Sequence, residues 1–184
     1  YGNMTFIAAR HPVGIIEVPC TTDTACIDES WVSQHQLQDF PESLKIGVRA
    51  FVLSLGVLDD QPHACHGDCK WGHRPLKIVF QQLKSFLSVN TREIITVVLE
   101  NDLAHGRAVL QAEIEGLIVE TGLDSFINVS ATAADNFGTR LGDLIDLEAR
   151  LVVFATGFDE NSENVLSRKH LSSVPLDCTG SSAV

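Results

Sequence analysis

The chain has 184 residues, and its 24 Asp and Glu against 13 Lys and Arg give a formal net charge of −11. This acidity disfavours binding to nucleic acid or standing attachment to anionic lipid, because the protein's own field repels phosphate groups. The length fits one domain over residues 1–184, and 45% apolar residues with 20% charged residues are typical of a globular protein. The longest apolar stretch, 50–58, is too short for a membrane helix of about 20 residues. We expect a monomer with no nucleic-acid partner and no transmembrane segment.

The elements expected in the first half of the chain are two strands, a helix and a third strand. The apolar runs over 5–9 and 50–55 are rich in β-forming residues and predict the first two strands. A helix is predicted over 76–87, where apolar residues recur at spacings of three and four and Pro75 stands at the first turn. A nearly continuous apolar run over 93–99 indicates a strand that is buried on both faces.

The second half continues the alternation. A helix is predicted from Val109 to Ile118, with Gly122 as its C-cap glycine. A shorter helix over 139–148 leads into a strand over 150–155. The tail from Asp159 onward shows no helix or strand period. Alternating strands and helices predict an α/β fold with a parallel sheet and right-handed crossovers.

The five cysteines form two close pairs and one isolated residue: Cys20 with Cys26, Cys65 with Cys69, and Cys178. Two local disulfides fit this spacing, while the sequence leaves the pairing open. A zinc site over 65–69 is disfavoured, because a structural zinc needs a second pair of ligands at similar spacing. Together with glycosylation sequons at Asn3 and Asn128, disulfides indicate a secreted glycoprotein.

Candidate catalytic groups follow the carboxyl ends of three predicted strands, which is where α/β barrels carry their chemistry. Arg10 and His11 follow the first strand, His66 follows the loop after the second, and residues 100–102 end the third. Two histidines can act as base and acid on opposite sides of one reaction near neutral pH. The alternative for each histidine is a solvated loop position without a catalytic role. The alternative for residues 65–69 is a turn that is only held closed by a disulfide.

Seven blocks, in order, resemble the phosphatidylinositol-specific phospholipase C X-domain superfamily: 1–11, 47–49, 63–69, 76–87, 93–100, 141–145 and 150–154. The likeness is strongest to secreted fungal phospholipase C-like phosphodiesterases. It implies a TIM-type (β/α) barrel and hydrolysis of a phosphoinositide-type phosphodiester in lipid metabolism, with transient contact to a membrane surface at most. A complete barrel has about 250 residues, so we expect about five or six of its eight units here, without the C-terminal strands.

The resemblance also implies the site residues. His11 corresponds to the general base and His66 to the general acid, and Glu100 falls at a calcium-ligand position of the family. Glu100 and Arg49 are predicted to bind substrate, while the alternative for Arg49 is a structural ion pair inside the barrel.

The chain departs from the family pattern at Pro12, Val52 and Ser54, where calcium-binding members carry metal ligands and metal-independent members carry an Arg at the last position. One remaining carboxylate cannot hold Ca²⁺, which takes six to eight oxygen ligands, so we expect no metal and no cofactor. Loss of the cation removes stabilisation of the charge that builds on the phosphoryl group. The alternative function is therefore a pseudoenzyme or truncated member that binds a phosphorylated ligand or a partner without turnover.

Overall fold

The computed structural model describes residues 8–10, 30–31, 39–66, 69, 72–101, 109–128, 140–155 and 164–167. The elements in chain order are β1 (Ala8–Arg10), β2 (Ser30–Trp31), α1 (Phe40–Lys45), β3 (Ala50–Leu58), β4 (Gln61–His66), β5 (Gly72–Pro75), α2 (Leu76–Val89), β6 (Ile95–Asn101), α3 (Gln111–Thr121), the 3₁₀ helix η1 (Asp124–Phe126), α5 (Leu141–Asp146), β7 (Leu151–Ala155) and β8 (Leu166–Ser167).

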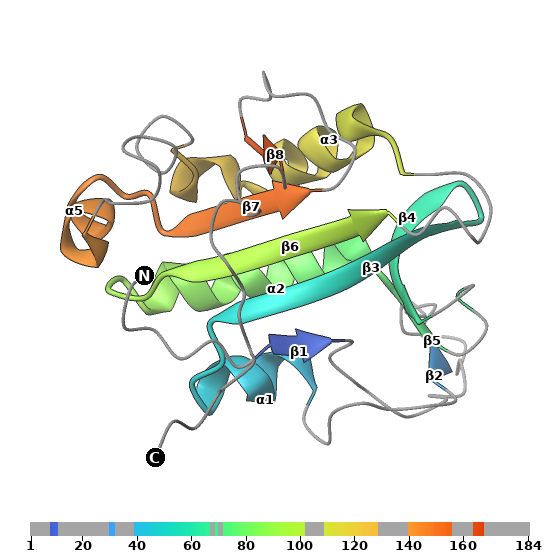
Figure 1. Ribbon diagram of the computed structural model, residues 1–184, viewed down its shortest axis with the longest axis horizontal. Coiled ribbons are helices and arrows are strands. Elements are labelled where there is room, and N and C mark those ends of the chain that lie inside the picture. Colours follow the sequence, from blue (N-terminus) through green and yellow to red (C-terminus); the bar gives the residue numbers. More distant parts are fainter. Residues whose placement is uncertain are drawn as a thin grey trace, which may run out of the picture.

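The strands form one mixed sheet in the order β2-β5-β4-β3-β6-β7-β8, and β1 also pairs with β3 (Figure 1). Strands β1, β3, β6, β7 and β8 run parallel, whereas β3, β4, β5 and β2 are joined by antiparallel pairs. The predicted α/β class and the parallel strands are confirmed. Within the described residues the sheet is open, because the path ends at β2 on one side and at β8 on the other.

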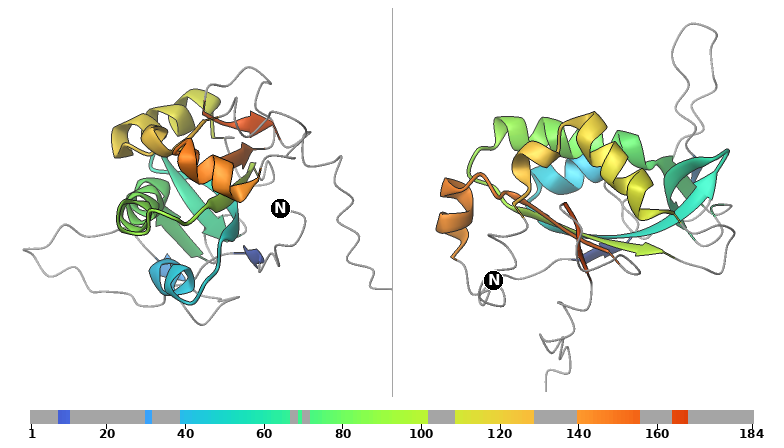
Figure 2. Two further views of the ribbon diagram at one scale, coloured as in Figure 1. Left: turned by 90° about the vertical axis from the view of Figure 1, so that its left-hand side faces the viewer. Right: turned by 90° about the horizontal axis from the view of Figure 1, so that it is seen from above.

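The two faces of the sheet carry different layers. Helices α1, α2 and α3 cover one face, which we call the helix face (Figure 2). Leu53 of β3 and Leu99 of β6 point into this layer and belong to the larger apolar core. On the opposite face, which we call the inner face, Val152 and Phe154 of β7 form a smaller cluster with Leu144 of α5. Successive strand residues alternate between these two layers, as the period of a strand requires.

Helices α2 and α3 follow the sequence prediction closely. The apolar stripe of α2 is buried along its length: Leu76, Val79, Phe80, Leu83 and Leu87. Gly122 ends α3 with φ at 71°, the left-handed conformation that favours glycine at a helix C-cap.

Three parts of the sheet differ from the prediction. The expected first strand began at Thr5, whereas the described strand covers Ala8–Arg10 and residues 5–7 lie outside the described residues. Strand β3 runs on to Leu58 and turns back into β4 through Asp59 and Asp60, whose φ angles of 47° and 59° fit a tight hairpin turn. The tail contains β8, a two-residue strand that was not expected, paired with β7.

Arg49, at the amino end of β3, binds the carbonyl end of the neighbouring helix α1. Arg49 precedes β3 and donates to the carbonyl oxygens of Leu44, at 2.6 Å, and Val48, at 2.8 Å. Its Nε lies 2.8 Å from Oε2 of Glu93. Because the last carbonyls of a helix lack partners and carry partial negative charge, a guanidinium there stabilises α1.

The pair of Arg49 and Glu93 makes stability depend on pH. The Arg49 guanidinium holds the pKa of Glu93 below its usual value, by a hydrogen bond and by charge, while partial burial opposes this. A carboxylate with a lowered folded-state pKa adds stability above its unfolded pKa, and that stability is lost as pH falls through the folded-state pKa. We expect Glu93→Gln to lower the urea midpoint at pH 7, with the difference from wild type shrinking as pH falls through the folded-state pKa of Glu93. Glu120→Gln, which removes only an exposed pair with Lys77, serves as the control and is expected to change little over the same pH range.

Candidate functional site

The carboxyl end of the parallel strands brings Ser54 and Glu100 side by side. These residues are register partners on β3 and β6, so they share the inner face, and both are half-buried. Val52 lies two residues earlier on the same face of β3 and pairs in register with Arg10 of β1. Glu100 therefore lies at the edge of the sheet where the sequence placed it, beside a hydroxyl rather than beside a second carboxylate or an arginine.

One edge of β3 pairs with two strands, β1 near its start and β4 further along. Strand β6 occupies the other edge from Ala50 to Leu55, so both β1 and β4 must lie on the remaining one. Along it, β1 makes its last pair between Arg10 and Val52, and β4 makes its nearest pair between Ala64 and Leu55. We call this segment of β3, residues 52–55, the β3 junction.

The two predicted catalytic histidines flank the β3 junction in the sequence. His11 is the residue after β1, and it lies outside the described residues together with Pro12. His66 is the last residue of β4, two residues after the pair that β4 makes with Leu55. His66 was expected after the loop that follows the second strand, with a solvated loop position as the alternative; its backbone ends an antiparallel strand instead.

A disulfide joins Cys65 to Cys69, which confirms the expected local bridge. Both sulfurs pack on Gly56 of β3: a Cβ at position 56 would lie 2.6 Å from Sγ of Cys69 and 3.0 Å from Sγ of Cys65. Real Cβ atoms do not approach other atoms so closely, so the bridge requires glycine there. The second expected bridge and Cys178 fall outside the described residues.

Two further imidazoles lie beside the disulfide. The rings of His63 and His73 meet edge to face, with their centroids 5.7 Å apart. Nδ1 of His63 is 2.9 Å from the carbonyl oxygen of Gln61, and Nδ1 of His73 is 3.0 Å from that of Cys69. A carbonyl only accepts hydrogen bonds, so Nδ1 carries a proton in both rings. No pattern in the sequence points to this pair, because it forms only when Cys65 and His73 align in register across β4 and β5.

Arg49 lies at the opposite end of the sheet from Glu100. It precedes the first residue of β3, whereas Glu100 aligns with Ser54, about 16 Å further along the strand at the usual rise per residue. The structural alternative for Arg49 is present as its ion pair with Glu93, and its guanidinium also stacks on Phe86, 4.8 Å from the ring centroid. The structure therefore does not bring the two predicted substrate-binding residues together.

Asn101 fastens the chain immediately after Glu100. Its Nδ2 donates to the carbonyl oxygen of Val109 at 2.9 Å, and its Oδ1 accepts from the amide of Val109 at 3.0 Å. The side-chain amide thus joins the two ends of the intervening segment, residues 102–108, in the manner of a strand pair.

We expect Asn101→Asp to destabilise the fold by about 1–3 kcal/mol, because a carboxylate keeps the bond to the Val109 amide but faces the Val109 carbonyl without a donor. Urea unfolding at pH 7 measures this. Gln81→Glu makes the same chemical change at an exposed position of α2 and is expected to stay within about 0.5 kcal/mol of wild type. Equal losses in the two variants would contradict the role assigned to Asn101.

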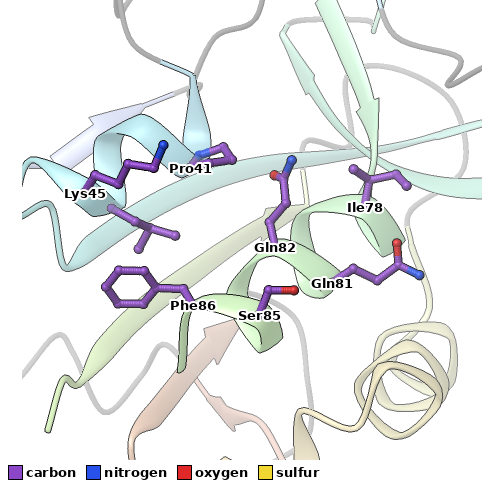
Figure 3. A pocket seen from close by; sticks show the side chains of 8 residues that line it. Pro41, Lys45, Ile78, Gln81, Gln82, Ser85 and Phe86 are labelled. Atoms are coloured by element: carbon purple, nitrogen blue, oxygen red, sulfur yellow. The ribbon is translucent and has the colours of Figure 1, made fainter. Parts of the chain in front are cut away.

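A cavity of about 320 Å³ lies on the helix face, between α1 and α2 (Figure 3). Its lining consists of Pro41, Leu44, Lys45, Ile78, Gln81, Gln82, Ser85 and Phe86. None of the predicted site residues contributes to it. Within the described ranges, no three His, Cys, Asp or Glu residues gather as metal ligands would. The described helices are also too short or too polar to cross a membrane.

Comparison with known proteins identifies the family. A family model described as PI-PLC X matches residues 16–169. No curated protein matches the chain. Among solved structures, a histidine-to-tyrosine mutant of the phosphatidylinositol-specific phospholipase C from Staphylococcus aureus is 18% identical, with a TM-score of 0.48, and a double mutant of the same enzyme is 18% identical, with a TM-score of 0.49. Each alignment covers 68% of this chain and 40% of the solved chain, so this chain spans about two fifths of their length. The family model covers most of the sequence, and the chain therefore belongs to the PI-PLC X family.

Proposed function

We propose that this protein is a phospholipase C-type phosphodiesterase that cleaves a phosphoinositide-type diester without a metal ion. The observation that carries the proposal is the β3 junction. Strands β1 and β4 approach each other along one edge of β3, and the histidines of the two family blocks follow one strand and end the other. This arrangement supports a shared site for the two segments at the carboxyl end of the parallel strands, near the register pair of Ser54 and Glu100.

The proposed reaction is attack of a headgroup hydroxyl on the adjacent phosphorus. His11 removes the proton of that hydroxyl as the new P–O bond forms, and His66 donates a proton to the glycerol oxygen as its P–O bond breaks. The products are a cyclic phosphate of the headgroup and a neutral diacylglycerol. Glu100 accepts a hydrogen bond from another headgroup hydroxyl. The proposed site does not include Arg49, because its guanidinium is engaged with Glu93 and with the end of α1.

We further infer a TIM-type barrel to which the described parallel strands belong, and a secreted monomer. The five parallel strands support the barrel, because each one pairs with the next parallel strand along the chain. A TIM-type barrel repeats this arrangement around its axis until the sheet closes. The Cys65–Cys69 bridge supports an oxidising compartment.

The proposal is tested with the purified chain on phosphatidylinositol in mixed micelles, by measuring water-soluble inositol phosphate with and without a calcium chelator. We expect release that the chelator leaves unchanged. Release that requires added Ca²⁺ would contradict the metal-independent mechanism. Release no greater than that of a His11→Ala/His66→Ala double variant would contradict the enzymatic function.

Binding without turnover is the second candidate, and one observation favours it. Glu100 lies next to Ser54, where metal-independent members of the family place an arginine, so the inner face carries an acid where the phosphoryl charge needs a cation. Titration calorimetry with inositol phosphate separates the two candidates, because a pseudoenzyme binds this ligand while the micelle assay stays at background.

A further inference from the structure

We propose that the Cys65–Cys69 disulfide and His73 form a redox-dependent device that positions His66. This inference rests on the proposed function, because it assigns His66 a catalytic role. Cys65 and Cys69 are the ends of a short covalent ring that contains His66. A ring of this size restricts the backbone of every residue within it, which lowers the entropy that must be lost to hold one imidazole in place.

The disulfide contacts three strands: it begins in β4, lies beside β5 and packs on β3. Cys65 belongs to β4 and pairs in register with His73 of β5. The sulfur atoms lie on Gly56 of β3, where a side chain would collide with them. Both cysteines are buried, with 0% and 6% of their surface exposed. The bridge is therefore fixed to the same strand, β3, that carries the β3 junction.

His73 holds the second end of the ring. Its protonated Nδ1 donates to the carbonyl oxygen of Cys69 at 3.0 Å. Cys69 has φ at 65°, in the left-handed region that residues other than glycine rarely adopt. Such a conformation persists only when surrounding contacts enforce it, and here the disulfide and the His73 hydrogen bond do so.

Reduction would release this arrangement. An external dithiol transfers two electrons and two protons to the disulfide. The Cys65–Cys69 S–S bond breaks and two cysteine thiols form, while the external dithiol is oxidised to a cyclic disulfide. Cys69 is then free to leave the left-handed region, and the covalent link between Cys65 in β4 and Cys69 is lost. His73 acts here as a positioning residue, because it contacts Cys69 of the disulfide-closed ring and is assigned no contact with the reacting atoms.

The first experiment compares wild type with Cys65→Ser/Cys69→Ser, each with and without dithiothreitol. We expect kcat to fall by about 10²-fold in the double variant, with KM within about twofold, because misplacing one catalytic group affects the chemical step more than binding. Wild type should fall to the same value under dithiothreitol, and the double variant should not respond. An unchanged kcat in the double variant would overturn the proposal.

The second experiment keeps the disulfide and changes His73, so it does not depend on the double variant folding. In His73→Asn the side-chain NH₂ replaces Nδ1 as a donor of similar reach, whereas His73→Gln displaces that donor and His73→Ala removes it. We expect kcat near wild type for His73→Asn and a loss for the other two. If His73→Asn loses as much activity as His73→Ala, the imidazole itself is needed and the positioning role is wrong.

A readout without turnover separates this inference from the proposed function. The ring signals of His66, assigned by their absence in His66→Gln, are followed by NMR in wild type and in the double variant at one pH. We expect their chemical shifts to differ between the two proteins, because the bridge restricts the backbone on both sides of His66 only in wild type. A chain that cleaves nothing but shows this difference fails the proposed function and supports the positioning. An active chain whose His66 signals ignore the bridge overturns the positioning alone.

Discussion

Replacing His11 or His66 with Ala is expected to lower kcat for phosphatidylinositol by about 10²–10⁴-fold, the usual contribution of a general base or acid. The reason is that each histidine is assigned one proton transfer, and water at the same place is a much weaker base or acid near pH 7. The urea midpoint should stay at the wild-type value in both variants. His170→Ala, at a histidine outside every block of the resemblance, is the control and should retain full activity.

The pH profile distinguishes the two roles. A base that must be neutral produces the rise of kcat/KM on the acid side, and an acid that must be protonated produces the fall on the alkaline side. His11→Ala should therefore lose the acid limb and His66→Ala the alkaline limb. If both variants keep the shape of the wild-type profile, neither residue is the titrating group and the assignment is wrong.

Replacing Arg150 with Ala is expected to destabilise the fold by about 3–5 kcal/mol, because it removes two hydrogen bonds from a charged donor, each of which contributes about 1.5–3 kcal/mol. Arg150 is 3% exposed and donates to the carbonyl oxygens of Leu87, at 2.8 Å, and Asn90, at 3.1 Å, which end α2. Its guanidinium also lies 4.6 Å from the ring centroid of Phe126. The Ala variant loses these contacts and leaves the Leu87 carbonyl without this donor, whereas the Asn90 carbonyl keeps its bond from the Glu93 amide.

Two variants test whether this loss comes from the buried guanidinium. Arg150→Lys keeps the charge but cannot reach two carbonyls in a planar geometry, so its loss should be intermediate. Arg92→Ala removes an exposed arginine near the same end of α2 and should change stability by less than about 0.5 kcal/mol. Thermal or urea unfolding at pH 7 measures all three. A loss for Arg150→Ala no larger than that for Arg92→Ala would show that the buried contacts contribute little.

Regular local patterns made most of the parallel part of the fold predictable. Helix α2 was expected over 76–87 because its apolar residues recur at helical spacing, and the same residues are buried in the structure. Strands β6 and β7 were expected because nearly continuous apolar runs are typical of strands covered on both faces. Gly122 was predicted as a C-cap because glycine adopts without strain the left-handed conformation that commonly ends a helix.

The antiparallel extension was not predictable in the same way. Strands β4 and β5 contain three histidines, a cysteine, an arginine and two prolines, so neither run shows the composition of a strand. Their pairing depends on the Asp59–Asp60 turn and on register with β3, which act across the chain. For this reason His66 was not expected in a strand, and the pair of His63 and His73 was not foreseen.

For the candidate site, the sequence predicted which residues lie at the ends of strands. It did not predict the register between strands, which decides which of these residues are neighbours. Glu100 was expected at the end of its strand, yet its neighbour Ser54 follows only from the register of β3 with β6. Arg49 was predicted to bind substrate as a cation near the site in sequence, with a structural ion pair as the alternative, and only the structure shows its guanidinium engaged with Glu93 at the opposite end of the sheet.

The length of the β3 junction sets the spacing between the points where β1 and β4 pair with β3. Val52 and Leu55 are three residues apart, roughly 10 Å along a strand, and no other described strand pairs with both β1 and β4. Deleting Ser54 would shorten this spacing by about 3.3 Å and turn every later side chain of β3 to the opposite face. Val57 would then occupy the place that Gly56 leaves open for the sulfurs of Cys65 and Cys69. The length of β3 and the fit of the disulfide therefore constrain each other, and neither can change alone.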